Sequence, residues 1–171
     1  MKKIFLFLIF VFLSTDLVRY QATCIEKRIP FFLWPHVKCS FFPEINIIVA
    51  DTDHLAHQGF CDANESEFKN TVIWFPSVSE ATVFVNTNPG YGTVISDIQV
   101  VFLDRNWSVL DIKTMEKESG TAIAPAHTDS ALEAIPALIG KLGLKKGKLS
   151  NFLIKKINNE YVCLRRKSTS K

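Results

Sequence analysis

The sequence predicts an α+β domain dominated by β-structure, a small barrel-like antiparallel or mixed sheet with two short helices. Short apolar runs rich in β-branched and aromatic residues recur along the chain, separated by turn-forming residues. Only two segments carry both a helix start signal and a stop signal. At 171 residues and 47% hydrophobic, the chain suits one domain with a packed core.

The N-terminus resembles a targeting segment. Lys2 and Lys3 precede an unbroken apolar run over residues 4–13, which is typical of a secretory signal peptide and too short to span a bilayer. A buried N-terminal helix or strand is the alternative. Neither Ser14 nor Ala22 offers a clean cleavage site, so lipidation at Cys24 and an uncleaved anchor both stay open. We expect residues 1–23 to be a signal peptide or N-terminal membrane anchor. The protein is then exported, either periplasmic or anchored to the membrane.

Residues 24–44 are aromatic and rich in proline, which prevents a regular helix. We expect this segment to be extended, either laid over the core or used as an edge strand. Residues 45–171 then form a single β-rich domain with a basic C-terminal hairpin and tail.

Within that domain, local signals predict the elements in order. Residues 45–50 form a β-branched strand, followed by a short helix from Asp51 as N-cap to Gly59 as stop. Two strands joined by a short turn follow at 71–75 and 82–85.

A loop at residues 88–92 precedes the clearest hairpin, whose strands at 94–103 and 107–112 turn at 104–106. We expect residues 116–128 to be a loop and 131–134 a short strand.

Two further patterns close the chain. Pro136 is placed to open a helix that runs to Leu142 and stops at Gly143. Apolar alternation at 152–157 and 161–164 flanks Asn158-Asn159, a favourable hairpin turn pair.

The even number of cysteines suits an oxidising compartment and allows up to two disulfides with three connectivities. Buried free thiols are the alternative. None of the spacings matches a zinc knuckle or a thioredoxin-type site. The cysteines are Cys24, Cys39, Cys61 and Cys163.

Positive charge is concentrated at the C-terminus. Residues 141–171 carry ten Lys and Arg against one acidic residue, although the net charge is only +3. In an exported protein this asymmetry favours an anionic membrane surface or envelope polymer, and we expect no nucleic-acid partner. A solvated basic tail is the plain alternative.

Residues 45–147 resemble the domain-of-unknown-function 192 family, a small prokaryotic domain. The resemblance lies in the order of four motifs: Ala50-Asp-Thr followed by a helix, Val72-Ile-Trp-Phe, Ser96-Asp-Ile through Asp104, and Ala131-Leu-Glu133 through Gly147. The family's Trp-Met-Lys strand has no match here: Val83-Phe-Val-Asn-Thr87 stands in its place. The resemblance implies a divergent member, and it implies Asp97, Asp104 and Glu133 as recurring carboxylates.

Asp97 and Glu133 are the candidate functional carboxylates, able to serve as acid or base or to bind a cation. Their structural alternative is hydrogen bonding to backbone or basic groups, and we expect Asp104 to be a turn residue. The glycine-framed loop is the candidate ligand contact, with a plain tight turn as the alternative. Its residues are Asn88, Gly90, Tyr91 and Gly92.

No nucleophile, phosphate-loop or cofactor motif is present. His54 and His57 share one helix face, but spacing identifies no third metal ligand, so we expect neither a metal nor a cofactor.

Three functional hypotheses follow. The leading one is a non-enzymatic exported protein that binds a small ligand or an envelope protein. The second is an acid/base or hydrolytic enzyme that uses Asp97 and Glu133. The third is electrostatic attachment to anionic envelope surfaces through residues 141–171.

Overall fold

A computed structural model describes residues 27–166 of the chain. The predicted signal peptide or anchor over residues 1–23, and the predicted role of Cys24, lie outside the described residues. Within residues 27–166, no helix has the length and apolar character needed to cross a membrane.

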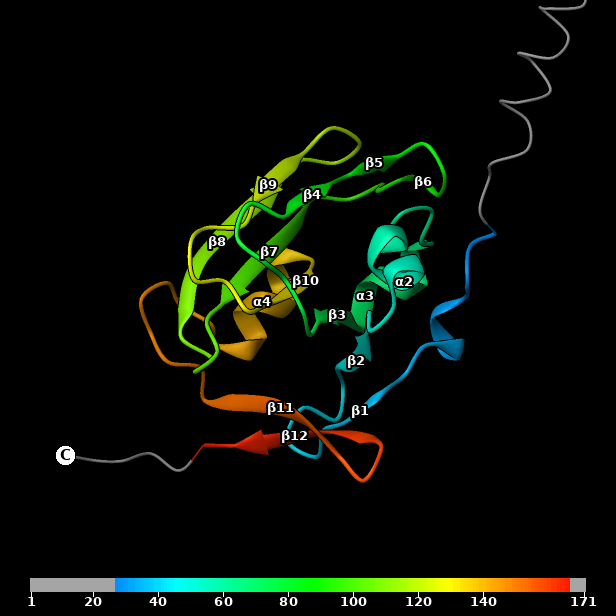
Figure 1. Cartoon of the computed structure of the whole chain (residues 1–171). Helices are drawn as coiled ribbons and strands as arrows, with labels where there is room; N and C mark the ends of the chain where they lie inside the picture. Colours follow the sequence, from blue (N-terminus) through cyan, green and yellow to red (C-terminus); the bar gives the residue numbers. More distant parts are fainter. Residues whose placement is uncertain (1–26, 167–171) are drawn as a thin grey trace, which may run out of the picture.

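The centre of the fold is a mixed five-stranded sheet with the order β2-β3-β10-β7-β8 (Figure 1). β2 and β3 are parallel, and every other neighbouring pair is antiparallel. The α+β class with β-structure dominating is thereby confirmed, but the barrel-like closure is wrong, because the sheet is open and ends at β2 and β8. The strands are β2 (Asn46–Val49), β3 (Thr71–Phe75), β7 (Ile98–Leu103), β8 (Val109–Met115) and β10 (Ser130–Ala134).

β3 and β10 are buried along their whole length because both faces of the sheet are covered. One face packs on α4 (Pro136–Leu142) and on the β11–β12 hairpin (Phe152–Ile157 and Glu160–Arg165). The other face packs beneath α2 (Asp53–Gln58) and α3 (Glu65–Asn70). Side chains alternate between these two cores along each strand.

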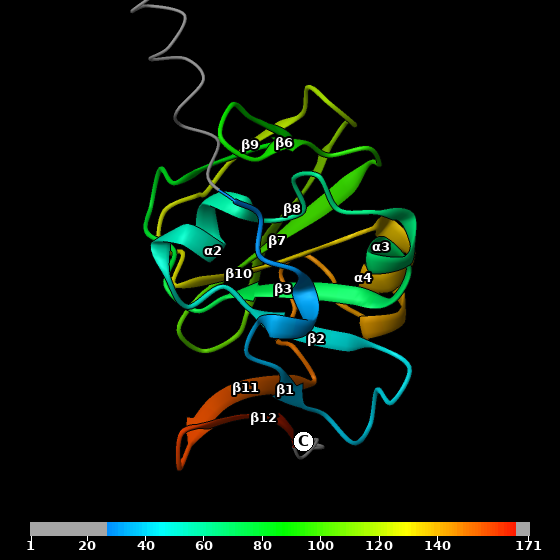
Figure 2. The ribbon, with the colours of Figure 1, turned by 90° about the vertical axis from the view of Figure 1, so that its right-hand side faces the viewer.

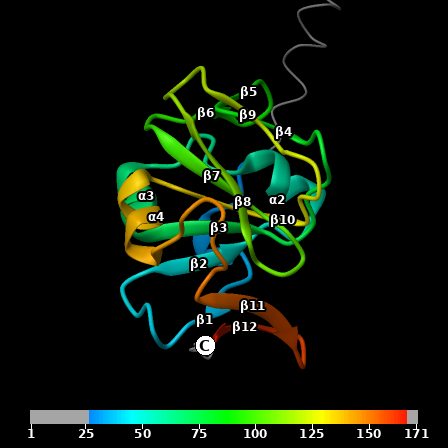
Figure 3. The same cartoon turned by 90° about the vertical axis from the view of Figure 1, so that its left-hand side faces the viewer.

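The β11–β12 hairpin belongs to a second, three-stranded sheet, order β1-β12-β11, that lies below β2 in Figures 2 and 3. Asn158 and Asn159 have φ values of 49° and 65°, the left-handed pair that a tight hairpin turn needs. β1 (Val37–Lys38) is an edge strand parallel to β12. The prediction of this hairpin is confirmed, and residues 37–38 of the segment that was expected to be extended form an edge strand.

Two other local predictions are confirmed. Asp104 accepts hydrogen bonds from the backbone N–H groups of Asn106 and Ser108, both at 2.8 Å, and so holds the β7–β8 turn. α4 opens with Pro136 and ends at Gly143 in the left-handed conformation.

Several elements differ from the predictions. α2 is capped by Thr52, whose side chain accepts from the N–H of Leu55, and not by Asp51. α3 makes a third α-helix, and η1 (Phe31–Leu33) is a single 3₁₀ turn in the proline-rich segment.

The predicted 116–128 loop contains a strand, β9 (Thr121–Ile123), which pairs with β4 (Val83–Val85). β4 therefore leaves β3 for another sheet. The short ribbon of β5 (Thr87–Asn88) and β6 (Gly92–Thr93) completes the strands, and it lies with β4 and β9 at the end opposite the β11–β12 hairpin (Figure 3).

Candidate functional site

Glu133 lies in the middle of β10, where its strand neighbours are Ile73 of β3 and Val100 of β7. Its side chain is on the same face as Ala131, toward α2. It is 4% exposed, and it is the one buried Asp, Glu, Lys or Arg among residues 27–166. The fold thus buries a carboxyl group at the centre of the five-stranded sheet, on the side covered by α2.

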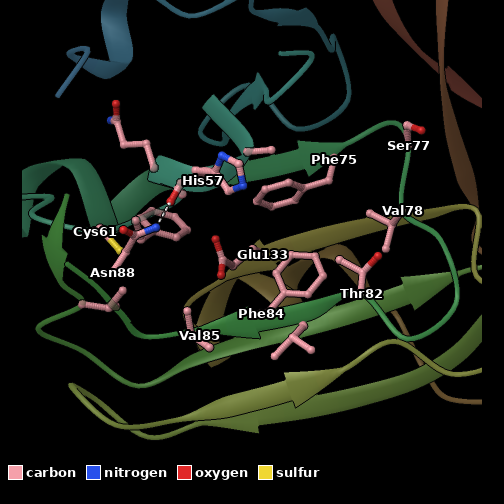
Figure 4. Close-up of a pocket in the computed structure, with 16 residues that line it drawn as sticks. His57, Cys61, Phe75, Ser77, Val78, Thr82, Phe84, Val85, Asn88 and Glu133 are labelled. Carbon is pink, nitrogen blue, oxygen red and sulfur yellow. Dashed lines mark hydrogen bonds between the residues drawn. The ribbon is translucent and has the colours of Figure 1, made fainter. Parts of the chain in front are cut away.

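The carboxyl group of Glu133 faces a cavity of about 210 Å³ between the end of α2 and β4 (Figure 4). That volume equals roughly seven water molecules in the liquid. The apolar part of the lining includes three phenylalanine rings, Phe60, Phe75 and Phe84, and Val78. Residues with polar side chains also line it: His57, Gln58, Cys61, Ser77, Thr82 and Asn88.

Oε2 of Glu133 is buried without a hydrogen-bond partner among the described residues. Burial disfavours the charged form and raises the pKa of Glu133 to about 8. At neutral pH the group is therefore mostly the neutral acid. It can give or accept a hydrogen bond, and it becomes an anion near pH 8.

Gly59 brings the backbone directly against this carboxyl group. A Cβ at Gly59 would lie 3.2 Å from Oε2 of Glu133, and its φ of +47° also disfavours other residues. The preceding turn is held by Gln58, whose buried amide bonds both the N–H and the carbonyl of Ile29 at 2.8 Å. These hydrogen bonds fix the position of the turn at residues 58–59, which forms one wall of the cavity.

Cys61 lines the same wall of the cavity, and its thiol does not suit nucleophilic chemistry. Burial and the nearby Glu133 raise the pKa of Cys61 to about 11. A thiol that stays protonated at physiological pH is a poor nucleophile.

Of the predicted ligand loop, Asn88 lines the cavity and Gly90, Tyr91 and Gly92 do not. The side-chain N–H of Asn88 donates to the carbonyl of His57 at 3.0 Å, which ties β5 to the end of α2 (Figure 4). Tyr91 was a candidate ligand contact, yet its side chain is 7% exposed and its hydroxyl forms a hydrogen bond with Nδ1 of His54 at 3.1 Å. An aromatic side chain beside the α2 face gains more by packing than by exposure.

Asp97 is separate from the cavity. It is exposed, precedes β7, and accepts a hydrogen bond from the backbone N–H of Lys117 at 2.9 Å. The structure does not bring Asp97 and Glu133 together, so the expected pair of carboxylates is not formed. The contact to Lys117 is the structural alternative that the sequence had left open.

The three cysteines within residues 27–166, Cys39, Cys61 and Cys163, are free thiols, so none of the expected disulfides is formed among them. Lys38 pairs with Val162 in the parallel β1–β12 register, and continuing that register places Cys39 opposite Cys163. Burial and the neighbouring Cys39 thiol raise the pKa of Cys163.

The sequence analysis did not identify the phenylalanine and glycine residues that line the cavity as parts of a site. Phe75, Phe84 and Gly59 look like core or turn residues in a linear reading, because nothing local shows that β4 crosses back over β10. Among residues 27–166, no group of three or more His, Cys, Asp or Glu side chains is arranged to hold a metal ion.

No family model and no curated protein matches the chain. Among solved structures, a protein of unknown function from Novosphingobium aromaticivorans aligns at a TM-score of 0.49 and 18% identity, over 60% of this chain and 71% of that one. A Sinorhizobium meliloti protein, described provisionally as a transcription regulator, aligns at a TM-score of 0.49 and 12% identity, over 60% and 78%.

Proposed function

We propose that this protein is a non-enzymatic binding domain of the cell envelope that holds a small molecule in the cavity above Glu133. The proposal rests on one observation: the cavity ends on a buried carboxyl oxygen that has no partner in the described part of the chain.

A carboxyl group in that position is unfavourable for folding alone. Burying a polar group without a hydrogen bond costs about 1–3 kcal/mol in proteins, and an apolar residue at the centre of β10 would avoid that penalty. Concave sites with mainly apolar linings and a few convergent polar groups are the usual form of small-molecule sites. A ligand that satisfies Oε2 of Glu133 would offset the penalty.

The acid/base enzyme has weaker support. Glu133 is the single carboxyl among the lining residues, and its raised pKa would suit a general acid. Hydrolytic chemistry with paired carboxyls needs a second group nearby, and Asp97 lies outside the cavity.

The test is a fragment screen on isotope-labelled protein, read as amide chemical-shift changes. The screen should contain neutral, cationic and anionic molecules of about four to ten non-hydrogen atoms, sized to the cavity. We expect at least one fragment to shift amides of α2, β4 and β10 together.

A blocking variant locates the binding. Ala56 is exposed on α2 and lines the cavity, so Ala56→Trp should fill it without disturbing the core and abolish these shifts. Lys69→Trp, at an exposed helix position on α3 away from the cavity, is the matched control and should leave them intact. If no fragment produces shifts that Ala56→Trp removes, the proposal is wrong.

Export, membership of the domain-of-unknown-function 192 family and attachment to anionic surfaces are further parts of the proposal. The N-terminal apolar run supports export, the order of the motifs supports the family, and the ten basic residues over 141–171 support attachment. Lys146 already forms an ion pair with Asp111 at 2.7 Å, and Lys156 and Arg165 lie over the rings of Tyr161 and Phe41. Sedimentation with phosphatidylglycerol vesicles that disappears in high salt would test the attachment.

A further inference from the structure

We propose that the ligand of this cavity is a small organic cation, an ammonium group on a short apolar arm that pairs with Glu133. The inference rests on the proposed binding function and narrows it to one chemical class.

Three features give the cavity a negative character. The first is Glu133. Among residues 27–166 it is the only residue of the lining that can carry a full negative charge below about pH 9, because Cys61 stays a thiol there. The second and smaller one is the C-terminal end of α2, since residues 56–59 line the cavity and helix C-termini carry partial negative charge. The carbonyl groups of His57 and Gln58 there already accept hydrogen bonds from Asn88 and Cys61.

The third feature is the aromatic lining. Phe75 and Phe84 meet edge to face, with ring centroids 5.1 Å apart and planes at 88°, and both border the cavity that Glu133 faces (Figure 4). Aromatic rings attract ammonium groups over their faces, and the attraction grows where water is excluded. The same rings supply an apolar surface for a short hydrocarbon arm.

Little positive charge opposes these features. The elements around Glu133 are β3, β7, β4, β5 and the end of α2, and the lining residues that they supply include no lysine or arginine. The titratable groups besides Glu133 are His57 and Cys61, both from α2 or the turn after it. A carboxylate ligand would meet the buried acid with no cation to receive it, so an anion is disfavoured.

Binding of a cation is therefore linked to the proton on Glu133. Burial keeps this group mostly protonated below its pKa of about 8, and a cation favours the carboxylate. The cation releases a proton when it binds, so its affinity rises with pH up to about 8 and then levels off. A neutral ligand that accepts the acid's hydrogen bond shows the opposite trend.

The test uses three probes of nearly equal size and different charge: n-butylammonium, n-butanol and n-butanoate. Dissociation constants are measured on the full chain by amide shift titration between pH 6 and pH 9, where an alkylammonium with a lysine-like pKa of about 10.4 keeps its charge. At pH 8.5 we expect n-butylammonium to bind about tenfold more tightly than n-butanol, because only the ammonium group forms an ion pair with Glu133. n-Butanoate should bind most weakly.

Three variants identify the responsible group. Glu133→Gln keeps the shape of the side chain and should reduce the preference for n-butylammonium over n-butanol to about one, with no pH dependence. Asp97→Asn removes an exposed carboxylate outside the cavity and should change neither. His57→Asn should leave the rise in affinity between pH 7 and pH 8 in place, because the rise belongs to Glu133.

The outcomes separate the two proposals. If n-butanol binds at the cavity as tightly as n-butylammonium, or if the affinity for n-butylammonium falls as pH rises, the proposal of a cationic ligand is wrong. The proposal of a small-molecule binding function then still stands. If neither these probes nor the fragment screen gives shifts that Ala56→Trp removes, both are wrong.

Discussion

Replacing Glu133 with glutamine should make the protein more stable, and by an amount that grows with pH. The side chain is 4% exposed and Oε2 has no partner in residues 27–166, so the folded state resists ionisation of this carboxyl group. Glutamine has nearly the same shape and no charge. The variant therefore removes the penalty of ionising a buried acid and leaves the packing around β10 in place.

The magnitude follows from proton linkage. Glu133 has a pKa of about 8 in the folded protein and an ordinary value of 4.5 when exposed. Below pH 4.5 both states carry the proton and the carboxyl group adds no pH dependence. As pH rises from 4.5 to 8 the unfolded state ionises first, so the folded state loses about 1.4 kcal/mol per pH unit, up to about 5 kcal/mol.

The assay is urea denaturation of both proteins from pH 5 to pH 9, read as the free energy of unfolding. The advantage of Glu133→Gln over the natural protein should widen from about 1 kcal/mol at pH 5 to about 3 kcal/mol at pH 7, and approach a constant value of about 5 kcal/mol above pH 8. Asp97→Asn is the matched control, because an exposed carboxylate has no burial penalty to remove. A difference between Glu133→Gln and the natural protein that does not change with pH would refute the reasoning, since it would mean that Glu133 ionises as easily folded as unfolded.

Three further predictions concern the scaffold. Gly59→Ala should lower the free energy of unfolding by about 1–3 kcal/mol, because its φ is +47° and its Cβ would crowd Oε2 of Glu133. Its control, Gly140→Ala, is in an open helical position of α4 and should raise it by about 0.5–1 kcal/mol in the same denaturation experiment. Asn64→Ala should cost about 1 kcal/mol by removing the capping box of α3, measured in the same way. Oxidised glutathione should accept two electrons and two protons from the Cys39 and Cys163 thiols and leave a disulfide between them. The disulfide should appear in non-reducing peptide mass maps and raise the free energy of unfolding by about 2–4 kcal/mol. A map in which both thiols are unmodified contradicts this prediction.

The elements predicted well from sequence are those whose signals are local. Pro136 and Gly143 mark the two ends of α4, and Asn158-Asn159 marks a turn, because each residue type matches a backbone conformation that only a few residues favour. α3 carried an equally local signal, the capping box of Asn64 with Glu67, and could have been found in the same way.

The pairing of strands could not be predicted, because it depends on contacts between distant segments. A strand follows β3 near residues 82–85 as expected, but its residues 83–85 pair across a long connection with residues 121–123, in a sheet that does not contain β3. That crossing places Phe84 over β10 and closes one side of the cavity. A linear pattern records that a strand is apolar on one face, but it does not record which strand the face will meet.

The two candidate carboxylates show the same limit at the site. Asp97 was expected inside a strand over residues 94–103, but β7 begins at Ile98, and the Asp97 side chain accepts a hydrogen bond from the backbone of Lys117. Glu133 is inside β10, and the period-two alternation that buries Ala131 on the α2 face buries Glu133 with it. Position within the strand therefore separates the buried carboxyl group of Glu133 from the exposed one of Asp97.

The affinity for the proposed cation and the stability of the protein both depend on one quantity, the free energy needed to ionise Glu133 in the folded state. A cation that pairs with the carboxylate lowers that pKa, so binding recovers part of the roughly 5 kcal/mol that ionisation costs the folded state. The stabilisation of the natural protein by n-butylammonium should therefore increase between pH 6 and pH 8, over the same interval in which the unliganded protein weakens. Glu133→Gln removes both trends together, because the same buried oxygen, held beneath Gly59 by the sheet, produces them.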